Sequence, residues 1–138
     1  MLQGLGASAV FSLLMTATAP AVESQPVDPD AAEALLRAEL ASVDRASVVC
    51  VSVDGLPLAA DAAERLRRSG ILTAPDRDTC QSRIAIGDFA YRPELGTYEV
   101  RFTSQLFGGS SIAVMKHFTD GPARGWHVVT TYHVGVWL

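Results

Sequence analysis

The sequence predicts an α+β fold in which two helices pack on a five-stranded, mostly antiparallel sheet. Three observations support this prediction. The second half of the chain alternates runs of β-branched and aromatic residues with Gly-rich turns, which is typical of an antiparallel meander. Two upstream segments carry apolar residues at helical spacing, and a Val-rich run lies between them. With 138 residues and 49% apolar content, the chain fits one domain, residues 22–138, behind a separate N-terminal segment.

The N-terminal segment carries no charged side chain before Glu23, and residues 5–15 are mostly apolar. Small residues follow at the spacing that a signal peptidase reads, and cleavage after Ala21 avoids Pro20 at the new N-terminus. We expect residues 1–21 to be a secretory signal peptide of a periplasmic or secreted protein. The alternative is a retained N-terminal anchor, because about 20 uncharged residues can span a bilayer. Contact with a membrane is expected only in that second case.

A first helix is expected from Pro29 to about Ser42. Asp28 is a good N-cap, and Pro29 suits the first helical position. Glu33 and Arg37 should pair on the polar face at i,i+4 spacing. The apolar stripe that must cover the sheet consists of Ala32, Leu35, Leu36, Leu40 and Val43.

Residues 47–91 are expected to form a strand–helix–strand unit. The first strand is nearly continuous in β-branched residues, which indicates that both its faces are covered. Pro57 should open the helix and Gly70 should end it, and the crossover should be right-handed. A polar loop leads to the second strand. The expected bounds are 47–53 for the first strand, 58–69 for the helix, 73–82 for the polar loop and 83–91 for the second strand. The ion pairs expected on the helix are Asp61 with Arg65 and Glu64 with Arg68.

Two cysteines, Cys50 in the first strand and Cys80 before the second, are expected to form a disulfide. The alternative is a pair of unbonded, buried thiols in a cytosolic protein. Export and the disulfide support each other, because disulfides persist in oxidising compartments.

The C-terminal meander should comprise strands at 98–107, 111–118 and 126–137. In the first of these strands Val100 and Phe102 point to the core and Arg101 to the polar face. Gly108 and Gly109 mark a hairpin turn; the alternative, an anion-binding loop, is disfavoured because no helix follows them.

Histidines provide the first candidate chemistry. If Phe118 and Trp126 close the last hairpin, His117 lies opposite His127, and such a pair could bind a metal or transfer a proton. His133 lies too far along the strand to join them. The favoured interpretation is instead that each imidazole makes an ordinary hydrogen bond on the sheet and has no further role.

Asp88 is the second candidate, because it falls among the core positions of the strand at 83–91. A buried carboxyl there could act as a general acid. The favoured interpretation is instead a bulge at Gly87 that turns Asp88 to solvent. Asp76 and Asp78 flank Arg77 in a polar loop and are expected to be solvated.

No recognised catalytic, nucleotide-binding or metal-binding motif occurs, so no cofactor and no metal are expected. A net charge of −4 disfavours nucleic-acid binding, since phosphate contacts need a basic surface.

The C-terminal residues resemble the last hairpin of NTF2-like (cystatin-like) α+β domains. The similarity rests on Asp120-Gly121, on the run from Gly125 to Val129 with its Gly-Trp step, and on Tyr132 and Trp137. The whole chain is similar to small exported bacterial proteins that end in such a meander. The resemblance implies no catalytic residue.

Three function classes remain open. The favoured one is a non-catalytic exported accessory domain that binds a protein partner. The alternative is a domain that binds a small molecule in a pocket between helices and sheet, as the NTF2-like resemblance implies. A small enzyme using His117, His127 or Asp88 is the least favoured.

Overall fold

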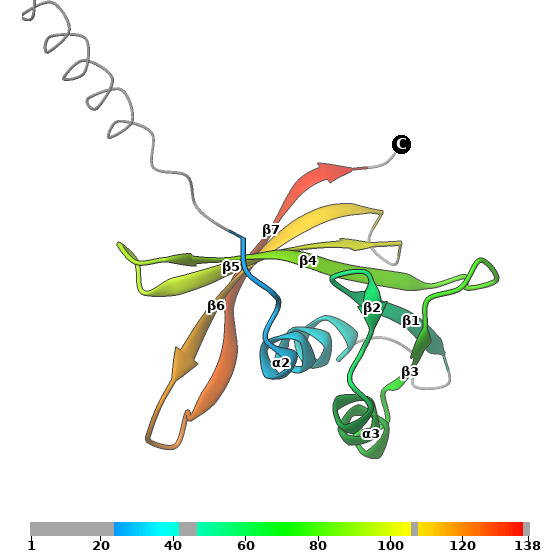
Figure 1. The fold of residues 1–138 in the computed structure, drawn as a ribbon, viewed down its shortest axis with the longest axis horizontal. Coiled ribbons are helices and arrows are strands. Elements are labelled where there is room, and N and C mark those ends of the chain that lie inside the picture. Colours follow the sequence, from blue (N-terminus) through cyan, green and yellow to red (C-terminus); the bar gives the residue numbers. More distant parts are fainter. Residues whose placement is uncertain (1–23, 42–46, 106–107, 137–138) are drawn as a thin grey trace, which may run out of the picture.

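The protein, seen in a computed structural model that describes residues 24–41, 47–105 and 108–136, has two helices on one face of a seven-stranded sheet (Figure 1). The α+β class and the mostly antiparallel sheet are confirmed, but the expected count of five strands is wrong. The helices are α2 (Pro29–Leu40) and α3 (Ala60–Arg68). The strands are β1 (Val48–Val53), β2 (Leu56–Pro57), β3 (Leu72–Pro75), β4 (Arg83–Arg92), β5 (Thr97–Ser104), β6 (Gly109–Phe118) and β7 (Gly125–Val136).

The two unexpected strands, β2 and β3, are short edge segments that each contain a proline. β2 folds back on the end of β1 through Asp54 and Gly55, which both have positive φ. Pro57 therefore belongs to β2, and α3 begins at Ala60 rather than at Leu58. β3 pairs in parallel with β1 inside the segment expected to be a polar loop. Runs this short carry no readable alternation, because strand patterns need several residues.

The sheet has the order β2-β1-β4-β5-β6-β7, with β3 also paired to β1. β1 and β4 are parallel neighbours, as the strand–helix–strand prediction requires. After α3, however, the chain first forms β3 on the far side of β1 and only then reaches β4. The connecting residues 76–82 cross the face of β1 that the helices leave free, where the side chain of Cys50 points.

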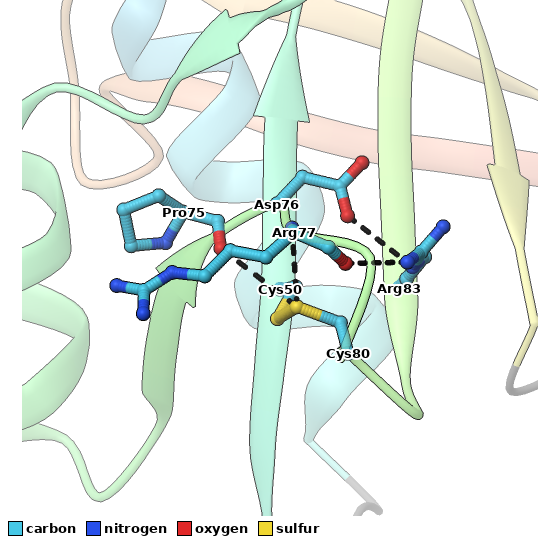
Figure 2. The surroundings of a disulfide bond; sticks show 6 residues. All are labelled: Cys50, Pro75, Asp76, Arg77, Cys80 and Arg83. Atoms are coloured by element: carbon cyan, nitrogen blue, oxygen red, sulfur yellow. Dashed lines mark hydrogen bonds and ion pairs between the residues drawn. A yellow bond between two sulfur atoms is a disulfide. The ribbon is translucent and has the colours of Figure 1, made fainter.

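A disulfide between Cys50 and Cys80 holds this crossing segment on β1, as predicted (Figure 2). The two Cα atoms are 6.2 Å apart across a sequence separation of 30 residues. Arg83, next to β1 on the same face, donates to the carbonyl oxygen of Arg77 and pairs with Asp76 at 3.3 Å. The interpretation that β1 is covered on both faces is thus confirmed: the helices cover one face and the crossing segment the other.

Helix α2 supplies most of the cover for the sheet. Asp28 caps it as predicted, since its Oδ1 accepts hydrogen bonds from the backbone N–H of Asp30 at 2.8 Å and of Ala31 at 3.4 Å. The helix ends at Leu40, and the expected continuation to Ser42 and Val43 lies outside the described residues. The core comprises Leu35, Leu36, Leu40, Val49, Val51, Leu66, Ile84, Ile86, Phe89, Val100, Phe102, Ala113 and Met115, with smaller neighbours.

Bulges re-aim side chains in β4 and β7. In β4 the pairing shifts between Gly87 and Ala90, with Asp88 at φ 52°, so that Phe89 turns into the core. The bulge expected at this point is confirmed. In β7 the pairing shifts twice, once between Val114 and Met115 of its partner β6. Each shift reverses which residues of β7 face the helices.

Candidate functional site

The main candidate site is an open groove of about 570 Å³ between the two helices and the β6–β7 hairpin. We call it the α2 groove. Helix α2 contributes one wall, α3 contributes Arg65, and the hairpin contributes an aromatic wall and Arg124. Its volume falls within the range of small-molecule sites. The lining residues are Asp30, Glu33, Ala34, Arg37, Arg65, His117, Phe118, Thr119, Arg124, Gly125 and Trp126.

A carboxylate held by two arginines forms the floor of the α2 groove. Glu33 accepts from Arg37 at 3.0 Å and from Arg65 at 2.8 Å, and its side chain is only 12% exposed. Arg37 also donates to the Ser69 hydroxyl at 2.6 Å, which ties α2 to the end of α3. The Glu33–Arg37 pair was expected. Arg65, expected to pair with Asp61 on its own helix, instead reaches across to Glu33 and, at 3.9 Å, to Asp30.

The pKa of Glu33 lies below its ordinary value. Burial alone would raise it, but hydrogen bonds from Arg65 and Arg37, together with their charges, outweigh that effect. Glu33 therefore stays ionised and neutralises part of the charge of both arginines.

Arg124 brings an unneutralised charge to the opposite side of the α2 groove. It sits in the β6–β7 turn, where its N–H donates to the Gly121 carbonyl at 3.2 Å. Two glycines with positive φ, Gly121 and Gly125, shape this turn. Within residues 24–41, 47–105 and 108–136 the Arg124 side chain makes no ion pair.

The aromatic wall of the α2 groove is anchored in the core. The indole of Trp126 packs edge-on against Tyr98 at 4.9 Å and Phe89 at 5.7 Å between ring centroids. On its other side the imidazole of His117 lies 4.8 Å away. The indole of Trp126 is therefore held in place, and its ring suits contact with a planar ligand, while the imidazole of His117 is tilted by 45° to it.

The predicted pairing of His117 with His127 is wrong. The hairpin closes with Phe118 opposite Gly125, so His117 pairs with Trp126 and His127 with Lys116. The two imidazoles therefore point to opposite faces of the sheet. His127 instead bonds to the Ala123 carbonyl oxygen.

Asp88, the other predicted candidate, lies exposed on the bulge of β4, 3.9 Å from Arg101. It has the solvent-facing position that the favoured interpretation gave it. Asp76 pairs with Arg83, and Asp78 is exposed. The described residues contain no group of three or more His, Cys, Asp or Glu side chains that could hold a metal ion.

A second polar cluster, missed by sequence reasoning, lies between the end of α2 and β7. The bulges in β7 place His133 on the helix-facing side, opposite Ser111, whose hydroxyl meets its Nδ1 at 2.8 Å. Thr131 donates to Glu39 at 3.5 Å. Burial raises the pKa of Glu39, although Thr131 and His133 oppose the rise. Ser111 is 2% exposed, so its hydroxyl is not accessible to a substrate.

The outer face of β7, the face away from the helices, forms a second candidate surface. Tyr132, opposite Ile112 of β6, is 47% exposed there, and Val129 and Val134, which lie at the two bulges of β7, are 58% and 50% exposed. β7 is also the last strand in the sheet order, and its sequence from Gly125 to Val136 contains no Asp, Glu, Lys or Arg. We use the name β7 edge for this last strand together with its exposed side chains Val129, Tyr132 and Val134.

Comparisons with protein-family models, curated proteins and solved structures found no significant match to this chain. Neither described helix is long and apolar enough to cross a membrane.

Proposed function

We propose that this protein is an exported, non-catalytic accessory domain that binds a protein partner through the β7 edge. The observation that carries the proposal is an apolar, uncharged strand at the end of the sheet. Natural edge strands are usually kept from pairing by charged residues, prolines, short length or bulges, and of these β7 has only the bulges. β7 spans 12 residues and carries no charged or proline residue.

The chemistry of the β7 edge favours an extended segment of a partner as the bound element. Such a segment would add to the sheet through backbone hydrogen bonds, with its side chains against Tyr132 and Val134. Ile112 and Val114 of β6, half-buried beside β7, widen the apolar surface. Isolated exposed apolar residues are ordinary, but adjacent ones on a free strand mark a binding surface.

Export is the second part of the proposal. The disulfide is compatible with an oxidising compartment, and the pattern of residues 1–21 is that of a secretory signal. Intact mass of the chain from its native host tests this directly. Trimming near Ala21 and a mass two protons below that of the reduced chain are expected; a full-length chain with free thiols would contradict export.

Site-specific photo-crosslinking in the native host tests the protein-binding part. A photoreactive residue in place of Tyr132 should give one stoichiometric adduct, and the same residue at Leu95 should give none. Leu95 is the matched control, since it is exposed to 66% in the β4–β5 turn. Val134→Lys should abolish the adduct by placing a charge on the edge. An identical adduct at both positions, or none at Tyr132, would refute the β7 edge.

The α2 groove supports a second candidate function, the binding of a small molecule by an NTF2-like domain. The specific observation in its favour is a groove between helices and sheet that combines a fixed aromatic wall with convergent polar groups.

A further inference from the structure

We infer that the α2 groove binds a small organic acid in which a carboxylate is attached to a flat ring. The inference rests on the second candidate function, small-molecule binding, and names its ligand class. Three features of the described residues carry it: the charge of the groove, the unpaired guanidinium of Arg124 and the wall formed by His117 and Trp126.

The charge of the α2 groove selects an anion. Its lining holds three arginines and two acids, which gives a net charge of +1 with His117 neutral. The whole chain, in contrast, carries −4. Arg37 and Arg65 use only some of their N–H donors to bind Glu33, since a guanidinium has five such donors. A cationic ligand would be repelled, although aromatic walls can bind cations elsewhere.

Arg124 is the residue that can engage the anion most fully. Its guanidinium has no ion-pair partner within the described part of the chain, so a ligand does not have to displace one. A planar guanidinium matches a carboxylate in two parallel hydrogen bonds. A hydrogen bond from its backbone N–H to the Gly121 carbonyl oxygen fixes the turn that carries Arg124, which lines the groove.

The ring of the ligand is selected by the opposite wall. Trp126 is locked by its packing on Tyr98 and Phe89, and it therefore offers a surface that costs little entropy to bind. A flat ring can stack against Trp126 or His117, while its carboxylate reaches Arg124 in the turn that joins β6 to β7. An aliphatic acid or an inorganic anion would leave this wall unused.

The test uses the oxidised full chain and three probes: 2-naphthoate, its neutral analogue 2-naphthamide, and inorganic phosphate. The readout is an NMR titration that follows the indole N–H of Trp126 and the amide of Gly125. We expect 2-naphthoate to shift both signals saturably, 2-naphthamide to bind at least ten-fold more weakly, and phosphate to leave the indole signal unchanged.

Two matched variants locate the anion contact. Arg124→Gln should weaken 2-naphthoate binding at least ten-fold, whereas Arg68→Gln, which removes an arginine outside the groove, should leave it unchanged. Retained dispersion of the remaining amide signals shows that Arg124→Gln is folded.

The outcomes separate the ligand class from the function on which it rests. Equal binding of the acid and the amide would overturn the anionic ligand, and full binding to Arg124→Gln would overturn its contact with Arg124; both results would leave small-molecule binding in place. Phosphate shifting the indole signal as 2-naphthoate does would overturn the requirement for a ring. Absence of shifts with both naphthyl probes at millimolar concentration would overturn the ligand class and small-molecule binding together.

Discussion

At the scale of single residues, Glu33 joins the two helices through charge. It lies in α2 and binds Arg65 of α3, while Arg37 binds both Glu33 and Ser69 at the end of α3. Both arginines are more than a third exposed, so solvent screens these ion pairs and limits their contribution to stability. We nevertheless expect a detectable contribution, because the Glu33 side chain is only 12% exposed.

Glu33→Gln is expected to lower the free energy of unfolding at pH 7 by about 1 kcal/mol, since neutral Gln accepts weaker hydrogen bonds from arginine. The folded-state pKa of Glu33 is lowered, so its stabilisation is complete above its ordinary pKa of 4.5 and disappears as the pH falls through the lowered value. Urea unfolding at several pH values from 7 to 3 measures this. A loss of stability that stays constant across the series would contradict the ion-pair assignment.

Glu39 provides a control, because its ionisation should change the free energy of unfolding in the opposite direction to that of Glu33. Its folded-state pKa is raised by burial, so its ionisation costs stability at neutral pH and costs none below about pH 4.5. Glu39→Gln should therefore raise the free energy of unfolding at pH 7 by less than about 1 kcal/mol. The gain should vanish in acid, where wild type is also neutral. The same urea series should thus show the two variants on opposite sides of wild type.

The conformation and contacts of a single residue could be predicted from the sequence only where they depend on its neighbours in the chain. The cap at Asp28 and the bulge at Asp88 were predictable, because each depends on neighbouring residues. The cross-strand neighbour of His117 was not predictable, since it depends on where the hairpin closes. Closure at Gly125, one residue earlier than expected, moves His117 opposite Trp126.

At the scale of elements, the crossing segment at residues 76–82 depends on its covalent link. The segment follows the short strand β3 and passes over β1 without secondary structure of its own. Its attachments include the disulfide at Cys80, the contacts of Arg83, and a hydrogen bond of 2.9 Å from the backbone N–H of Cys50 to the Ser82 carbonyl oxygen. Pairing with β1 holds β3 and β4 on its two sides, and the disulfide is the covalent restraint that fixes the segment between them.

Cys50→Ala with Cys80→Ala is expected to lower the free energy of unfolding by about 3 kcal/mol, mainly because the unfolded chain regains the entropy of an open loop. Urea unfolding of the double variant measures the loss. Wild type treated with dithiothreitol should lose the same amount, which controls for cavities left by alanine. A double variant as stable as oxidised wild type would show that the disulfide does not stabilise the crossing segment.

Elements were predictable from sequence where their pattern is long. The first helix and the four long strands were found within a few residues, because capping and alternation repeat over many positions. β2 and β3 were missed, since pairing to β1, rather than their own sequences, makes them strands. The α2 groove was missed for a related reason: its arginines come from α2, α3 and the last hairpin, and only the Glu33–Arg37 pair is local in sequence.

At the scale of the whole molecule, the two candidate surfaces lie on opposite faces of the same hairpin. Trp126 faces the helices and the α2 groove, whereas Tyr132 points to the outer face. The charged groove and the uncharged edge also differ in chemistry. A single ligand of either kind would not fit both, so they should function independently.

To test whether the two surfaces act independently, binding at each surface is measured in the variant that alters the other surface. Arg124→Gln should leave the crosslinked adduct at Tyr132 unchanged, and Val134→Lys should leave the 2-naphthoate affinity within two-fold of wild type. The reason is that substitutions without shared contacts usually act additively. If Arg124→Gln instead abolishes the adduct, the partner must occupy the α2 groove as well as the β7 edge, and its bound segment should then carry an acidic side chain next to a ring.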